Sequence, residues 1–345
     1  MHLLRRGCAV AAMAAASVLA FAAPAQAHPL RYGDDASNWR SAVTGTTPAG
    51  AVQASMGDGV LRLTVTLAHA STVVIEGYND EPFVELRQDG AFVNTRSSTT
   101  YAVKGAQAVI PSSVDDTATP AWHRVSTTSS WSWHDTRTHW PGYALPPPVV
   151  ASPGTRQQVL DWRVPITADG VAGAVTGVLD WVPGPTGGVG AGIATASFVA
   201  VAALFAWRRR PWVISAGLVC LVAADVPHSV GMAVGRVGDV GSRLAALPGH
   251  GGLPFALWLL SLGSLIPRWR RRELGLYAAA ILALLFCFTE ALPSLSVLWQ
   301  SQAVNALPLA ATRALVAVLT GASVATFLAA SLSIMNNART TGGPE

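Results

Sequence analysis

The sequence predicts a multidomain protein: an all-β extracytoplasmic domain, antiparallel and sandwich-like, followed by an α-helical transmembrane bundle of about five helices. The first observation behind this prediction is composition, since 51% of the 345 residues are hydrophobic and only 12% are charged. That is too apolar for an ordinary soluble protein. The second is a change of pattern near residue 184, where short β-rich runs give way to long apolar ones. The third is a leader-like N-terminus.

Residues 1–27 have the three parts of a secretory signal peptide. Arg5 and Arg6 supply the positive charge, and an apolar run extends from Ala9 to Ala23. The small residues of Ala25–Ala27 then fit a cleavage site. We therefore expect the mature chain to begin at His28 and residues 28–183 to form the exported β domain.

Alternating and β-branched runs predict the strands of this domain. Leu61, Leu63, Val65 and Leu67 fall on one face of a period-2 pattern, which is typical of a half-buried strand. Gln88-Asp89-Gly90 is a hairpin signal. No cysteine lies between residues 28 and 183, so no disulfide is expected there. Further strands are expected at 72–75, 82–86, 91–94, 158–164 and 171–182, with 111–120 linking two halves that could be separate small sandwiches.

The second half of the chain, residues 184–335, predicts the membrane bundle, with a tail at 336–345. Arginine clusters at 208–210 and 268–272 follow the first and third apolar runs, and the positive-inside rule makes these loops cytoplasmic. With the β domain outside, five spans place the C-terminus in the cytoplasm. The expected partner is the lipid bilayer of a bacterial plasma membrane, because a single lysine and abundant Ala, Gly and Pro are typical of a GC-rich bacterial genome. The expected spans are 189–207, 212–234, 253–267, 274–292 and 309–334.

The most distinctive stretch of the exported domain is Trp131–Trp140. His134, Asp135 and His139 are candidate metal ligands, with His123 upstream, because imidazole and carboxylate suit copper, zinc or iron. The spacing of the two histidines matches no standard zinc motif. The alternative is that the tryptophans pack the core while the polar groups bond to the backbone.

His28 adds a copper hypothesis. An N-terminal histidine offers an amine and an imidazole, and some copper proteins chelate the metal with this pair and one further histidine. His69, His123, His134 and His139 are the candidates for the third nitrogen.

Four ionisable residues interrupt the predicted spans, where charges are costly and usually functional. Asp225 and His228 are three residues apart on the second span and share a face, Glu290 lies in the fourth span, and Arg313 lies near the start of the fifth. Three interpretations remain open. Arg313 could be an ion-pair partner that fixes helix packing, the other three could hold a metal, or the group could relay protons or ions.

Several phrases of the sequence resemble an uncharacterised family of bacterial exported membrane proteins. They are Gly77-Tyr78 with Glu81-Pro82-Phe83, Asp89–Asn94, Trp133-His134-Asp135 with His139-Trp140, and Asp180–Pro185. The family's central motif is closer to W-H-D-H-R-x-H-W, and Thr136 stands where it has a third histidine. The resemblance spans most of the mature chain and implies no particular activity.

The function that the sequence favours is an integral membrane protein whose exported domain binds a ligand, with copper binding or sensing as the sharpest hypothesis. A structural or assembly role with an envelope protein partner is the alternative, and a small ion- or proton-coupled transporter is the third. No catalytic residue is predicted, since motifs for nucleotides, flavins or hydrolytic nucleophiles are lacking. Nor is nucleic acid an expected partner, because residues 28–182 hold ten basic and fourteen acidic residues.

Overall fold

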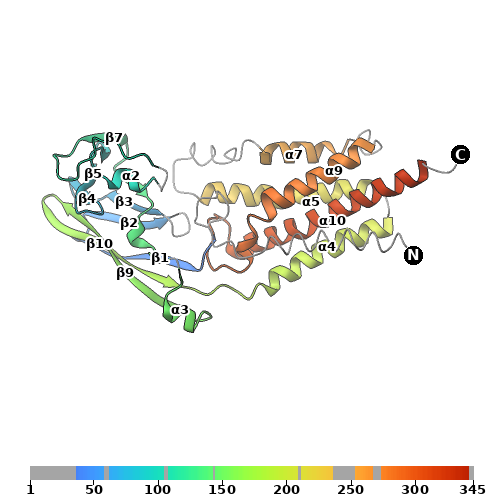
Figure 1. Ribbon diagram of the computed structural model, residues 1–345, viewed down its shortest axis with the longest axis horizontal. Helices are drawn as coiled ribbons and strands as arrows, with labels where there is room; N and C mark the ends of the chain where they lie inside the picture. Colours follow the sequence, from blue (N-terminus) through green and yellow to red (C-terminus); the bar gives the residue numbers. More distant parts are fainter. Residues whose placement is uncertain are drawn as a thin grey trace. The chain divides into compact units, whose positions relative to one another are not determined.

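A computed structural model describes residues 36–57, 62–104, 108–142, 144–208, 211–235, 253–266 and 273–341. The predicted signal peptide, His28 and both arginine clusters except Arg208 lie outside these residues. Figure 1 shows the strands in the first half of the described chain and the long helices in the second.

The described strands form two antiparallel sheets. The larger has seven strands in the order β1-β10-β9-β4-β5-β6-β7, and the smaller has three in the order β2-β3-β8. Two short helices, α2 (Thr99–Ala102) and α3 (Pro147–Ala151), lie in the connections. The strands are β1 (Trp39–Thr47), β2 (Val52–Gly57), β3 (Arg62–Leu67), β4 (Thr72–Glu76), β5 (Pro82–Arg87), β6 (Gly90–Asn94), β7 (Trp122–Ser126), β8 (Ser130–Trp133), β9 (Gln157–Ala168) and β10 (Val171–Trp181).

One hydrophobic core serves both sheets. Leu63 and Val65 of the smaller sheet belong to the same buried cluster as Ile75, Val84 and Ile166 of the larger one. Burial of apolar area of this kind is the main stabilising force of a fold without disulfides. The described strands therefore form one sandwich-like unit, and the idea of two separate small sandwiches is wrong.

The segment 111–120 also departs from its predicted role as a linker between halves. β6 and β7, which precede and follow it, pair directly in one sheet, with Val93 opposite His123. Asp115 N donates to the carbonyl of Arg96 at 2.9 Å, which holds the segment against the domain. It is a loop within a single domain.

The β3 to β6 strands and the β9–β10 hairpin occur close to where the alternating pattern predicts them. At the tip of that hairpin, Asp169 and Gly170 have φ values of 47° and 80°, the left-handed conformation that a two-residue turn requires. β1, β2, β7 and β8 were not predicted. β1 pairs with β10, which joins the first and last strands of the domain.

Four helices among the described residues are long and apolar enough to cross a membrane, and they lie within α4, α5, the α9–η2 segment and α10. The predicted third span contains only the 11-residue helix α7, so the count of five spans is not confirmed. A helix of 11 residues extends about 16 Å, roughly half of a bilayer core. The helices are α4 (Gly188–Arg208), α5 (Pro211–Gly235), α7 (Leu253–Gly263), α9 (Glu273–Leu285), the π-helix η2 (Phe286–Ala291), the 3-10 helix η3 (Leu295–Leu298) and α10 (Leu309–Thr341).

The contacts of α5 give the directions of its neighbours. Ser215 near its start donates to Ser264 after α7, while Asp225 accepts from Trp258 within α7, so α5 and α7 run antiparallel. A Cβ on Gly217 would lie 2.3 Å from Thr326 of α10, whereas Asn305, just before α10, bonds to His228 late in α5. The chain thus passes back and forth, and the C-terminal part of α10 lies on the same side of the bundle as the start of α5.

Candidate functional site

The Trp131–Trp140 motif begins on β8 and ends past a 3-10 turn, η1 (Thr136–Thr138). Asp135 is the N-cap of that turn, and its Oδ1 accepts from the backbone N–H of Arg137 at 2.9 Å. A short acceptor side chain at this position satisfies an N–H that the turn leaves unpaired. The motif is therefore a strand end followed by a capped turn.

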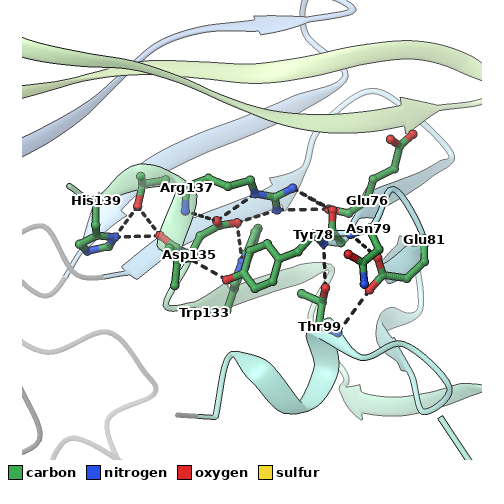
Figure 2. A network of polar contacts seen from close by, with 12 residues as sticks. Glu76, Tyr78, Asn79, Glu81, Thr99, Trp133, Asp135, Arg137 and His139 are labelled. Carbon is green, nitrogen blue, oxygen red and sulfur yellow. Dashed lines mark hydrogen bonds and ion pairs between the residues drawn. The ribbon is translucent and has the colours of Figure 1, made fainter. Parts of the chain in front are cut away.

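Asp135 is fully buried, and both of its carboxylate oxygens are engaged, as Figure 2 shows. Oδ1 accepts from the backbone N and Nε of Arg137, and Oδ2 accepts from the Arg137 guanidinium at 2.8 Å and from Trp133 Nε1 at 2.9 Å. A buried carboxylate requires this degree of pairing. These bonds assign Asp135 a structural task at the position where the sequence suggested a metal ligand.

Arg137 links the η1 turn to the β4–β5 connection. Its guanidinium donates to the carbonyls of Glu76 and Gly77 at 3.0–3.2 Å and lies 5.1 Å from the centroid of the Tyr78 ring. The Tyr78 hydroxyl accepts from Thr136 N at 3.1 Å. Burial, together with the charge of Asp135, raises the pKa of Tyr78, so this phenol stays neutral.

The same connection holds a second buried carboxylate that the sequence reasoning missed. Glu81 accepts from Asn79 N at 3.0 Å, Ser97 Oγ at 2.6 Å and Thr99 N at 3.2 Å (Figure 2). A Cβ at Gly77 would lie 2.2 Å from its carboxylate, so the close approach requires glycine. The Gly-Tyr-x-x-Glu spacing was a visible signal of such a turn.

The two histidines of the motif come together. The rings of His134 and His139 are stacked, with centroids 4.5 Å apart and planes inclined by 23°. His139 Nδ1 lies 2.8 Å from the carbonyl oxygen of Asp135 and 3.0 Å from Thr138 Oγ1. Burial, and then the neighbouring His139 ring, lowers the pKa of His134 from 6.5 to about 4, so its imidazole is neutral at pH 7.

The other predicted ectodomain ligands have different settings. His123 is an exposed residue of β7, in the larger sheet, whereas His134 follows β8 of the smaller one. His28 lies outside the described residues. Across the described ranges, no three His, Cys, Asp or Glu side chains are grouped so that they could hold a metal ion.

The tryptophans of the motif take part in packing. Trp133 is 2% exposed and meets Phe83 edge to face, with centroids 5.8 Å apart. Trp140 stacks on Trp39 at 6.5 Å and donates to the carbonyl of Ala144 at 2.8 Å. Pairs of this kind add about 0.5–1.5 kcal/mol beyond the area that they bury.

The helical region has its own polar cluster, around Asp225 of α5. Asp225 is fully buried and accepts from Trp258 Nε1 at 2.7 Å and from Ser229 Oγ at 3.5 Å. Trp258 was not a predicted site residue, and no local signal in the sequence joins two residues 33 positions apart.

His228 and Glu290 belong to the same region of the bundle. His228 is fully buried, and its Nε2 lies 3.1 Å from Ser294 Oγ. Glu290 lies in the π-helix η2 and accepts from Thr289 Oγ1 at 2.9 Å. A π-helix has a wider turn than an α-helix and often occurs at functional sites.

Arg313 of α10 donates to backbone carbonyls. Its Nε bonds to the oxygen of Val297 at 3.1 Å and its terminal nitrogen to that of Gln300 at 2.7 Å. The described hydrogen bonds of Arg313 thus fasten the end of η3 to α10, and none of them goes to Asp225 or Glu290.

These features define a protein with an antiparallel β domain followed by a helical region suited to a lipid bilayer. Comparison with protein-family models, with curated proteins and with solved structures finds no match for the sequence. The resemblance to a family of exported membrane proteins therefore stays a prediction.

Proposed function

We propose that this chain is a membrane-anchored metal-binding protein, that copper is the metal, and that His134 and His139 supply two of its ligands. The observation that carries the proposal is the approach of the two imidazole rings to 4.5 Å. Two imidazoles bound side by side to one metal have a similar spacing, because metal–nitrogen bonds are about 2 Å long.

The protonation and orientation of the two rings support metal binding. Metals bind neutral imidazole, and the pKa of His134 near 4 keeps that ring neutral at pH 7. A hydrogen bond at one ring nitrogen orients a metal-binding histidine, and the carbonyl of Asp135 takes this position at His139 Nδ1. Copper follows from the ligand type, since imidazole nitrogen suits it and it stands highest in the affinity order of divalent metals.

Two nitrogens do not complete a copper site, and His28 is the proposed source of the rest. Its amine and imidazole would add two nitrogens if the signal peptide is removed after Ala27. Near His134 the negative charge of Asp135, which raises the pKa of that ring, offsets the charge of Arg62, which lowers it and opposes a cation.

The experiment is copper binding to the full mature chain in detergent, measured by competition with a chelator of known affinity and by electron paramagnetic resonance of Cu(II). His134→Ala and His139→Ala should each weaken binding by at least about tenfold. His69→Ala is the matched control, because His69 is an exposed histidine whose Nδ1 lies 2.9 Å from the carbonyl of Gly50, at a different turn.

An extra glycine before His28 tests the N-terminal ligand and should remove the nitrogen signature of the amine. Equal binding by the wild type and the two variants would exclude the His134–His139 site. Binding that is lost with the glycine but kept in both variants would assign the metal to His28 alone.

The second candidate function is structural, and the buried Asp135–Arg137 network favours it. This network joins β8, η1 and the β4–β5 connection. If the purified protein holds no copper while its stability depends on the motif, we propose an envelope-assembly role in which the motif shapes a surface for a protein partner.

We further propose that the protein lies in a bacterial plasma membrane with the β domain outside and the C-terminus in the cytoplasm. The antiparallel packing of α5 with α7 and with α10 supports this, because the C-terminal part of α10 lies on the same side of the bundle as the start of α5, which follows Arg208 in the sequence. A reporter that is active only in the cytoplasm, fused after Glu345, should be active, and an inactive fusion with normal expression would contradict the topology.

A further inference from the structure

Asp225 is a buried acid whose described partners are neutral. It is fully buried at the middle of α5, and its hydrogen bonds come from an indole N–H and a serine hydroxyl. Neither donor carries charge, and the described salt bridges lie in the β domain. An ionised carboxylate in such a place carries a large desolvation cost that two neutral hydrogen bonds do not offset.

The donors around Asp225 select a proton over a metal cation. A metal ion needs several oxygen or nitrogen lone pairs around it, whereas Trp258 Nε1 presents a hydrogen to the carboxyl group and has no lone pair. The short distance of 2.7 Å leaves no room between Trp258 and Oδ2. A proton on the other oxygen keeps both hydrogen bonds and removes the charge.

A second observation concerns buried hydroxyl groups on the side of Asp225 toward the start of α5. Ser261 of α7 is fully buried, its Oγ has no hydrogen-bond partner in the described part of the chain, and it lies one turn after Trp258. Ser264 Oγ, another turn along, is likewise buried without a partner there, beside the hydroxyl of Ser215. Thr326 Oγ1 of α10, next to Gly217, is a third such group.

Buried polar atoms without partners are rare in proteins and call for an explanation. These three lie between Asp225 and the end of the bundle where α5 starts. On the other side of Asp225 are Ser229, His228 and Ser294, which are also buried. Hydroxyl and imidazole groups both donate and accept hydrogen bonds, as the steps of a proton path require.

We propose that Asp225 binds and releases a proton on a path through the helical bundle, between the His228–Ser294 end and the Ser215–Ser264 end. The step is proton transfer alone: the neutral acid gives up its hydroxyl proton to a hydroxyl or water oxygen on one side and regains one from the other. Among the residues whose side chains the structure describes, the other titratable groups of the packed helices are His228 and Cys220 of α5, Tyr277 of α9, Cys287 and Glu290 of η2, and Arg313 of α10, whereas α7 has none. The proposal does not depend on copper binding by the β domain.

The test uses the full chain reconstituted into vesicles, with a pH gradient followed by an enclosed dye and without added copper. Wild-type vesicles should dissipate the gradient faster than protein-free vesicles, and Asp225→Asn should reduce the rate to the protein-free level. Asp161→Asn makes the same chemical change on strand β9, where the carboxylate accepts from Gln158, and should match the wild type.

Infrared spectroscopy supplies a second readout that a folding defect does not imitate. The wild type and Asp161→Asn should show the carbonyl stretch of a protonated carboxylic acid that is absent in Asp225→Asn, and Trp258→Phe should shift it by removing the donor to Oδ2. An unchanged band in Asp225→Asn would overturn the proposal. So would proton flux by Asp225→Asn at the wild-type rate, or wild-type flux no faster than that of protein-free vesicles.

Discussion

The buried pair of Asp135 and Arg137 should be the most sensitive polar contact of the β domain. Asp135→Ala removes a fully buried carboxylate, leaves Trp133 Nε1 without its acceptor, and takes the counter-charge from the Arg137 guanidinium, which keeps its bonds to backbone carbonyls. Breaking a buried ion pair in this way costs about 3–5 kcal/mol. Because the Arg137 side chain is 21% exposed and reaches some solvent, we expect about 3 kcal/mol for Asp135→Ala.

Removing the other partner, Arg137, should lower the stability of the β domain by more. Arg137→Ala strands a carboxylate with no exposure at all, so the upper end of the range, about 5 kcal/mol, applies. The typical stability of a domain is about 5–15 kcal/mol, so either change is a large fraction of the whole. The double variant Asp135→Ala/Arg137→Ala should cost clearly less than the sum of the two, because neither charge is then left alone.

Hydrogen exchange of the full chain in detergent measures these differences at the β3–β8 ladder. At about 1.4 kcal/mol per factor of ten, protection of these amides should fall by about two orders of magnitude for Asp135→Ala and more for Arg137→Ala. Amides of α5 and α10 report on the bundle and should not change. A loss below about 1 kcal/mol in both single variants, or strict additivity in the double variant, would refute the reasoning.

Three further predictions concern the same domain. Trp133→Phe keeps an aromatic ring beside Phe83 but removes the donor to Asp135 and part of the buried volume, and should cost at least about 1–3 kcal/mol in hydrogen exchange at β8; no loss would contradict the role given to that bond. Gly177→Ala places a Cβ 2.0 Å from the Trp162 ring and 2.3 Å from the Ala42 carbonyl and should lower the melting temperature, whereas Gly154→Ala meets nothing within 4 Å and should not; equal behaviour would refute the crowding argument. The pKa of His134 falls from 6.5 to about 4 on folding, so the unfolded chain binds more protons between these values and stability should fall as the pH is lowered from about 6.5 to about 4. The denaturation midpoint should depend less on pH in His134→Gln than in the wild type over that range. An equal pH dependence of the two midpoints would assign the effect to other groups.

The strands that the sequence predicted are those whose side-chain alternation matches their burial. Leu63 and Val65 of β3 are fully buried with more exposed residues between them, as the period-2 pattern requires. β1, with the sequence WRSAVTGTT, has few apolar residues, and β8 is only four residues long. These strands form because distant partners pair with them, β10 for β1 and β3 for β8, and that pairing leaves no local pattern.

In the candidate site, too, local contacts could be predicted from the sequence and contacts between distant segments could not. Proximity of His134 and His139 was a fair expectation from five positions of separation, and the structure places their rings together. Asp135 has a bonding role that a capping argument would have predicted, since aspartate followed by Thr136-Arg137-Thr138 is typical of a capped turn. The contacts of Asp225 with Trp258 and of Arg313 with Val297 depend on how helices pack, which the residue types do not encode locally.

The surroundings of α4 have a consequence for how the protein adapts to its membrane. Only 6% of the residues in the apolar window of α4 are buried by the rest of the chain, against 56–61% in the other three long helices. Its close approach to the bundle is at Gly321 of α10, where a Cβ would lie 2.0 Å from the carbonyl of Ala194. One side of this helix packs on the bundle and the other is exposed, and its 20-residue apolar stretch extends about 30 Å, one hydrocarbon thickness. Packing along α10 should therefore set the tilt of α4, and a bilayer thinner or thicker than this helix would have to adjust around it.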